Sequence, residues 1–232
     1  MIILEEVTKS FGDVVAVSRL SAHIKENSIT GFLGPNGAGK STTQKLIMGE
    51  IKPSLGKVEF MGENPWNNSA VKRNIGYVSE DEDLYLWMTS TQFVSSMARL
   101  CMPREAAIKA TKEALRLVKL NTTKKIGAFS KGMKQRVKLA GAIVHSPKLL
   151  LLDEPFGGID PVGRKEMKNL IVDLRNDHGV TVLVSSHILH EIDEISTHML
   201  LIHRGQTIAQ GRTTDIVELI DKYPHTITIK SE

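Results

Sequence analysis

Residues 34–41 read Gly34-Pro35-Asn36-Gly37-Ala38-Gly39-Lys40-Ser41, and the rest of the chain is interpreted outward from this stretch. The spacing matches a loop whose glycines let backbone N–H groups crowd around a bound phosphate. An apolar run at residues 28–33 predicts a strand before the loop, and residues 40–48 predict a helix after it. The N-terminus of that helix and the charge of Lys40 both favour an anion. We therefore expect this loop to bind phosphate groups and the Ser41 hydroxyl to face Mg²⁺.

The remaining apolar runs predict an α/β fold. Short runs at residues 75–79, 149–152 and 180–184 alternate with longer helical patterns, which is typical of a parallel sheet with crossover helices. Residues 2–24 instead alternate between apolar and polar around a Phe11-Gly12-Asp13 turn, and residues 199–209 do so around Arg204 and Gly205. These two segments predict antiparallel hairpins.

A helical segment interrupts the strand patterns between residues 83 and 146. Its clearest helix places one stripe of apolar residues on a single face: Ala107, Ala110, Ala114, Leu117 and Val118. We predict a single domain over residues 1–232, in which residues 1–82 and 147–232 form the nucleotide-binding core with the antiparallel β part. Residues 83–146 form an inserted helical subdomain, and a short helix and a strand at residues 226–229 end the chain.

Composition excludes several classes of protein. Cys101 is the only cysteine, so an intramolecular disulfide is impossible and a reducing compartment is indicated. No apolar run approaches the roughly 18 to 20 residues that cross a bilayer, and early acidic residues argue against a secretory leader. The net charge of +4 is scattered without interleaved aromatic residues. We therefore expect a solvated surface and no nucleic acid partner.

A second acidic motif follows the apolar run at residues 149–152. Asp153 and Glu154 come directly after it, and the carboxyl ends of parallel strands face the ligand crevice. This is the Walker B arrangement. We expect Asp153 to hold Mg²⁺, directly or through water, and Glu154 to act as the general base or to orient the attacking water.

Further segments follow in a fixed order. Residues 129–136 read Phe-Ser-Lys-Gly-Met-Lys-Gln-Arg, residues 158–161 read Gly-Ile-Asp-Pro, and His187 follows the run at residues 180–184. Together with the phosphate loop and Asp153-Glu154, this set resembles the ATP-binding cassette (ABC) ATPase family from about residue 3 to residue 211. The resemblance implies a P-loop NTPase core with an antiparallel β subdomain and an inserted helical subdomain.

The resemblance also implies roles for individual residues. It implies that Glu154 and His187 are catalytic, and that Ser41, Asp153 and Glu80 contact Mg²⁺. The nucleotide-binding residues it implies are Phe11, which would stack on adenine, with Gly34, Pro35, Asn36, Gly37, Ala38, Gly39, Lys40, Ser41, Thr42, Glu80, Ser130, Gly132 and Asp160.

Partners follow from the same resemblance. In this family the segment at Ser130 and Gly132 closes over ATP held by a second cassette, and two ATP molecules bridge the dimer. The resemblance implies a separate integral membrane permease, a position at the cytoplasmic face of the plasma membrane, and ATP hydrolysis coupled to transport.

Two departures from the family pattern stand out. Glu80 occupies the position where the family usually has glutamine, and Lys131 and Met133 replace the commoner glycine and glutamine. Both resemble the branch that serves exporter-type and antibiotic- or peptide-efflux systems. Residues 84–87 read Leu-Tyr-Leu-Trp and are either a socket for a helix of the membrane partner or a packed loop.

Three alternatives remain open from the residues. The first is a soluble ABC ATPase that acts in assembly, translation or DNA maintenance, although this chain has one cassette and no sustained heptads. The second is a non-hydrolysing regulatory cassette. The presence of the expected nucleotide-binding and catalytic residues argues against it: Lys40, Asp153, Glu154 and His187. Alternatively, His187, His190, Glu191 and Glu194 hold a metal, although no third convergent ligand set is evident.

Overall fold

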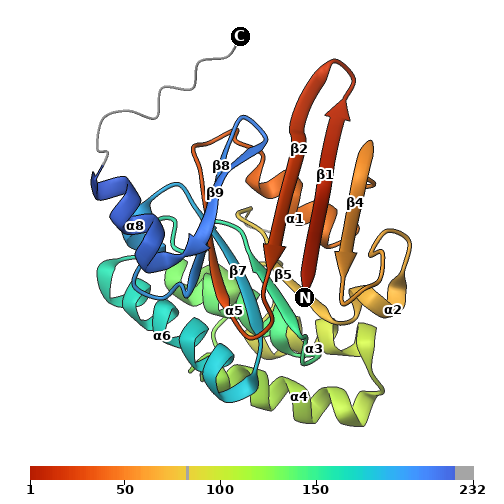
Figure 1. Ribbon diagram of the computed structural model, residues 1–232. Helices are drawn as coiled ribbons and strands as arrows, with labels where there is room; N and C mark the ends of the chain where they lie inside the picture. The colour runs from red at the N-terminus through yellow and green to blue at the C-terminus, as the bar shows by residue number, and fades with distance from the viewer. Residues whose placement is uncertain (82–83, 223–232) are drawn as a thin grey trace.

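The computed structural model describes residues 1–81 and 84–222 and contains two sheets (Figure 1). The larger sheet runs in the order β5-β6-β7-β3-β8-β9. Its strands are β5 (Ile75–Val78), β6 (Leu149–Leu152), β7 (Thr181–Ser186), β3 (Ile29–Leu33), β8 (His198–His203) and β9 (Gln206–Arg212). All neighbours pair in parallel except β8 and β9, which form an antiparallel hairpin. The predicted α/β fold is confirmed.

The smaller sheet is antiparallel and has the order β2-β1-β4. Its strands are β1 (Ile2–Phe11), β2 (Val14–Ile24) and β4 (Leu55–Phe60). The hairpin of β1 and β2 confirms the prediction for residues 2–24. The sequence reading missed β4, whose first three residues are exposed and therefore lack the alternation of a half-buried strand.

Helices cover the larger sheet and build the lobe at the lower end of Figure 1. They are α1 (Lys40–Ile47), α2 (Ser69–Lys72), α3 (Ser90–Cys101), α4 (Arg104–Leu117), α5 (Lys131–Ile143), α6 (Pro161–His178), α7 (Leu189–Ile192) and α8 (Thr213–Lys222), with a 3-10 turn at Ile126–Ala128. None of the helices within residues 1–81 and 84–222 is long and apolar enough to span a membrane. The predicted strand at residues 226–229 lies outside the described residues.

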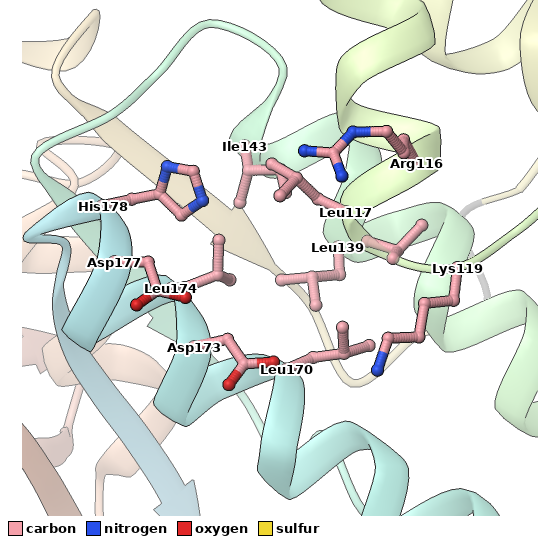
Figure 2. Close-up of a pocket in the computed structure, with 11 residues that line it drawn as sticks. Arg116, Leu117, Lys119, Leu139, Ile143, Leu170, Asp173, Leu174, Asp177 and His178 are labelled. Atoms are coloured by element: carbon pink, nitrogen blue, oxygen red, sulfur yellow. The ribbon is translucent and has the colours of Figure 1, made fainter.

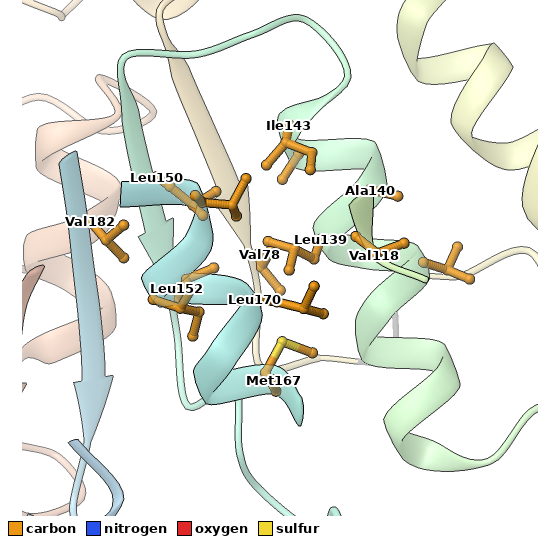
Figure 3. Close-up of a cluster of buried hydrophobic side chains, with 14 of the residues drawn as sticks. Val78, Val118, Leu139, Ala140, Ile143, Leu150, Leu152, Met167, Leu170 and Val182 are labelled. Atoms are coloured by element: carbon orange, nitrogen blue, oxygen red, sulfur yellow. The ribbon is translucent and has the colours of Figure 1, made fainter. Parts of the chain in front are cut away.

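The core lies on both faces of the larger sheet. Along β6, Leu150 and Leu152 join one buried cluster, while Leu149 and Leu151 join the other. Figure 3 shows the first cluster, in which side chains of the strands meet those of α5 and α6. The second cluster joins the sheet to α1 and the antiparallel β part. Because both faces are covered, β6 is apolar at every position.

The helical lobe is tied to the core through α5. The Nε2 atom of His145, just beyond α5, lies 3.2 Å from the carbonyl oxygen of Ile75 on β5. A Cβ atom at Gly76 would lie 2.3 Å from the carbonyl oxygen of Ala142, so only glycine lets the helix approach the strand this closely. The subdomain boundaries at residues 82 and 147 stay a prediction, because α5 packs against both parts.

Candidate functional site

The phosphate loop leaves β3 and enters α1, as predicted. A Cβ atom on Gly34 would lie 2.5 Å from the carbonyl oxygen of Ile202. Gly39 has a φ of 101° and stands at the N-cap of α1, and a Cβ atom there would lie 2.6 Å from the carbonyl oxygen of Ala16. Both positions therefore require glycine, and the loop is fixed against β8 and β2 with its N–H groups at the helix start.

Lys40 lies across the loop with its side chain only 6% exposed. Its ammonium donates to the carbonyl oxygen of Gly34 at 2.7 Å and to that of Pro35 at 3.3 Å. The same Nζ atom lies 3.2 Å from Oε1 of Glu154. The positive charge is thus held at the centre of the loop, against the carboxylate that follows β6.

Asp153 is buried at the end of β6. Its Oδ1 atom accepts a 2.6 Å hydrogen bond from the Ser185 hydroxyl on β7. The Tyr77 hydroxyl on β5 lies 3.5 Å from Oδ2. Burial raises the pKa of the Tyr77 hydroxyl well above its usual range, and the negative charge of Asp153 is the second largest cause of this shift. Three adjacent strands therefore orient the Asp153 carboxylate.

Glu154 lies between the ammonium of Lys40 and the imidazole ring of His187. Its Oε2 atom is 3.0 Å from Nδ1 of His187, while its Oε1 atom is the one near Lys40. Its backbone has a φ of 45°, a left-handed conformation that costs a non-glycine residue free energy. The N–H of Glu154 donates to the Ser185 hydroxyl at 3.0 Å. The turn thereby directs the carboxylate toward the phosphate loop and His187.

A cavity of about 420 Å³ opens beside Lys40 and Glu154, and neither Asp153 nor His187 is among the residues that line it. The residues that line it are Val14, Val15, Ala16, Asn36, Gly37, Gly39, Lys40, Ser41, Thr42, Glu80 and Glu154. The structure thus brings Glu80 to the loop. The sequence reading missed Val14 and Val15, which are exposed β-branched residues beside the Phe11 turn. Phe11 itself is 50% exposed and has the Lys9 ammonium 4.9 Å from its ring centroid.

Ser130, Gly132 and Asp160 form a second group, separate from the cavity lining. Ser130 is the N-cap of α5 and accepts from the N–H of Met133 at 3.3 Å. Asp160 is the N-cap of α6 and accepts from the N–H of Gly163 at 3.2 Å. None of the described residues that line the cavity comes from α5 or α6. Two helix N-termini therefore stand apart from this chain's own phosphate loop.

The segment at residues 84–87 is only partly exposed. Leu84 is buried, whereas Tyr85, Leu86 and Trp87 are 55%, 48% and 64% exposed. The rings of Tyr85 and Trp87 have centroids 6.1 Å apart, and the carbonyl oxygen of Leu86 accepts from Gly127 at 2.9 Å. Leu84 therefore packs into the core, as in the packed-loop alternative, and the exposed patch consists of the other three residues.

The alternative metal site near His187 does not converge. The Glu191 carboxylate accepts from the Ser186 hydroxyl, and the Glu194 carboxylate accepts from Lys168. His190 lies 3.4 Å from Asp193 and is 90% exposed at its side chain. Within residues 1–81 and 84–222, no group of three or more histidine, cysteine or acidic residues is arranged to hold a metal ion.

A further cavity of about 250 Å³ lies between α4, α5 and α6 (Figure 2). Its interior is apolar, with Leu139 and Leu174 among its lining residues, and Arg116 and Lys119 face Asp173 and Asp177 across it. None of the candidate site residues lines this cavity. It is therefore separate from the phosphate loop.

The site combines a glycine-rich phosphate loop, a buried lysine within that loop, and carboxylates at a strand end beside a histidine. Together these features define a nucleoside triphosphate hydrolase. Comparison with known proteins extends this class. The family model described as "ABC transporter" matches residues 17–157. This chain therefore belongs to the ABC transporter family.

Similar curated proteins and solved structures agree with that family. The "Bacitracin transport ATP-binding protein BcrA" of Bacillus licheniformis is 39% identical over 208 residues, covering 88% of this chain and 67% of the relative. The "Uncharacterized ABC transporter ATP-binding protein YxlF" of Bacillus subtilis (strain 168) is 32% identical over 235 residues, covering 100% of this chain and 78% of the relative. Both relatives are longer than the present chain.

Among solved structures, cbiO1 from Clostridium perfringens, described as part of the ABC transporter complex cbiONQ, has a TM-score of 0.84 and 29% identity, covering 96% of this chain and 93% of that chain. The "Dimeric Structure of MJ0796, a Bacterial ABC Transporter Cassette" has a TM-score of 0.83 and 25% identity, covering 92% and 99%. The protein is an ABC ATPase and the ATP-binding subunit of a transporter.

Proposed function

We propose that this subunit hydrolyses ATP with Glu154 as the general base and His187 as its partner at the γ-phosphate, and that hydrolysis drives a separate membrane permease. The observation that carries this proposal is the position of Glu154 between Lys40 and His187, beside the cavity over the phosphate loop. A general base must lie within hydrogen-bond reach of the proton it removes. A carboxylate at the rim of a phosphate-binding cavity meets that requirement for an attacking water.

The residues around the loop fit Mg²⁺. Magnesium prefers hard oxygen ligands and keeps several waters. Ser41 and Glu80 line the cavity with a hydroxyl and a carboxylate, and Asp153 adds a buried carboxylate that Ser185 orients. These three residues would hold the ion, which when bound supplies positive charge that offsets the charge of the phosphate oxygens.

The chain's own groups then divide the work. The glycine N–H groups and Lys40 bind and orient the phosphates. Val14, Val15 and Phe11 offer an apolar surface for the adenine ring of ATP. Glu154 takes a proton from water, and His187 contacts the γ-phosphate and orients that carboxylate. The ammonium of Lys40, now bonded to Gly34 and Pro35, is placed to exchange these carbonyl oxygens for phosphate oxygens.

The second group of residues supports a composite site. Ser130 and Asp160 stand at helix N-termini outside the cavity lining, and helix N-termini bind anions. We propose that Ser130 and Gly132 complete the site of a second cassette, and that ATP closes and hydrolysis opens the dimer. The similar cassette MJ0796 has a dimeric structure.

The remaining partner is the membrane permease that a transporter requires. The exposed Tyr85, Leu86 and Trp87 are the surface we propose for a permease helix at the cytoplasmic face of the plasma membrane. A relative named for bacitracin transport favours an exporter of antibiotic- or peptide-type substrates. The second candidate, a soluble ABC ATPase, has no comparable observation in its favour.

Mixing two inactive variants tests the composite site in a homodimer. We expect Ser130→Arg and Glu154→Gln each to hydrolyse ATP poorly alone. A mixed dimer keeps one complete site, because Glu154 of one copy meets Ser130 of the other. Hydrolysis rates of the two variants, separately and mixed before ATP is added, provide the measurement.

The control is each variant alone at the total protein concentration of the mixture. Thermal melting checks that both variants are folded. Activity in the Ser130→Arg and Glu154→Gln mixture no higher than the sum of the parts would contradict a composite site between identical copies.

Glu80→Gln tests the departure from the family pattern. Glutamine restores an N–H donor and removes one negative charge near Asp153 and Glu154, so we expect a changed hydrolysis rate with magnesium dependence retained. Initial rates over a range of ATP and Mg²⁺ concentrations provide the measurement. Kinetics identical to the wild type would count against a role for Glu80.

A further inference from the structure

One side chain fixes the backbone on both sides of His187. The Ser186 hydroxyl donates to Oε2 of Glu191 at 2.7 Å and accepts from the N–H of Ile188 at 3.0 Å. Ser186 is fully buried and Glu191 is 5% exposed. A buried, charge-assisted hydrogen bond of this length is strong and directional. The peptide that bears His187 is therefore held by Glu191 through Ser186.

The same carboxylate meets α6. Oε1 of Glu191 lies 3.4 Å from Nη1 of Arg164. One turn further along α6, the Lys168 ammonium donates to the carbonyl oxygen of His190 at 3.1 Å and to Oε2 of Glu194 at 2.8 Å. The segment that follows His187 is thus attached to α6 at two successive turns.

Arg164 lies close to the start of that helix. Its backbone N–H donates to the carbonyl oxygen of the N-cap residue Asp160 at 2.9 Å. Its Nη2 group reaches the carbonyl oxygen of Ile159 at 3.5 Å. A displacement of the Asp160 loop would therefore move Arg164, and with it the carboxylate that holds the His187 segment.

We propose that Glu191 is a positioning residue: it holds His187 against Glu154 through Ser186, and through Arg164 it couples His187 to the Asp160 loop. This inference rests on the role proposed above for His187. Glu191 lies in α7, four residues beyond His187, and does not line the phosphate cavity, so it acts on hydrolysis and not on nucleotide affinity.

Glu191→Ala tests the proposal in the 232-residue chain with ATP and Mg²⁺. We expect kcat to fall by about tenfold to a hundredfold, because misplacing a reacting group by about 1 Å costs that much. KM and the dissociation constant of ADP should stay within about twofold. Glu191→Gln keeps an oxygen that accepts from Ser186, so it should recover part of kcat.

Glu194→Ala is the matched control. Glu194 lies on the same segment and pairs with Lys168, but its side chain is 70% exposed and has no contact with Ser186. Its kcat should stay within about twofold of the wild type, since exposed pairs contribute little. A fall in kcat equal to that of Glu191→Ala would overturn the specific role of Glu191.

Two more variants separate the possible failures. Arg164→Ala leaves Ser186 and Glu191 in place, and the Arg164 side chain is 37% exposed, so the variant should fold and lower kcat with ADP affinity unchanged. A wild-type kcat in Arg164→Ala, or in a folded Glu191→Ala, overturns the coupling. If His187→Ala also has a wild-type kcat, the proposed role of His187 fails as well, whereas an impaired His187→Ala confines the failure to Glu191.

Discussion

Glu154→Gln is expected to abolish most ATP hydrolysis while leaving ATP binding intact. The amide occupies the same space beside Lys40 and His187, but it cannot take a proton from water. A general base contributes on the order of 10² to 10⁴ in rate, so turnover should fall by that factor. Steady-state hydrolysis and equilibrium binding of ATP provide the measurement.

The same variant should accumulate as an ATP-bound dimer. Closure needs bound ATP, and release needs hydrolysis, so a cassette that binds without hydrolysing is trapped. Size in solution with ATP and Mg²⁺, compared with the wild type and with ADP, tests this expectation. A variant that hydrolyses ATP like the wild type and stays monomeric would remove Glu154 from its proposed role.

Lys40→Met is expected to weaken ATP binding and to destabilise the nucleotide-free protein. Hydrogen bonds to charged groups contribute about 1.5 to 3 kcal/mol, which corresponds to roughly a tenfold to hundredfold loss of ATP affinity. The variant also removes the Lys40 ammonium from Glu154, which is only 8% exposed and then keeps only the contact with His187. Breaking a buried pair costs about 3 to 5 kcal/mol, so the free energy of unfolding should fall by an amount of that order.

The double variant Lys40→Met with Glu154→Gln separates the two effects. Removing the charge of the Glu154 carboxylate should restore much of the lost stability, while ATP affinity stays low. Chemical denaturation of both variants without nucleotide measures the first effect, and ATP titration measures the second. Equal stability of Lys40→Met and the wild type would show that the contact between Lys40 and Glu154 contributes nothing to folding.

Local patterns in the chain predicted much of this molecule. The glycine spacing at residues 34–41 predicted the turn between β3 and α1, because φ, capping and the close approach of neighbouring backbone constrain each position. The all-leucine run of β6 predicted a strand buried on both faces. Ser130 and Asp160 were named from the family resemblance, and the structure places them at the N-caps of α5 and α6.

Contacts between distant segments were not predictable in this way. Whether Leu84 is exposed or packed was left open by the sequence, and the structure places it in a buried cluster. Val14 and Val15 line the cavity only because the tip of the β1 and β2 hairpin lies beside the phosphate loop. The missed strand β4 is defined by its pairing with β1 and not by its own alternation.

The sequence by itself therefore determined the class of fold, the phosphate loop and the acidic end of β6, because each is encoded within a few consecutive residues. Only the tertiary structure decided that Glu154 lies between Lys40 and His187 and that Glu191 joins Ser186 to Arg164. These arrangements depend on side chains from separate elements meeting in a packed interior, and a hydrogen bond of about 3 Å is specified by that packing and not by spacing along the chain.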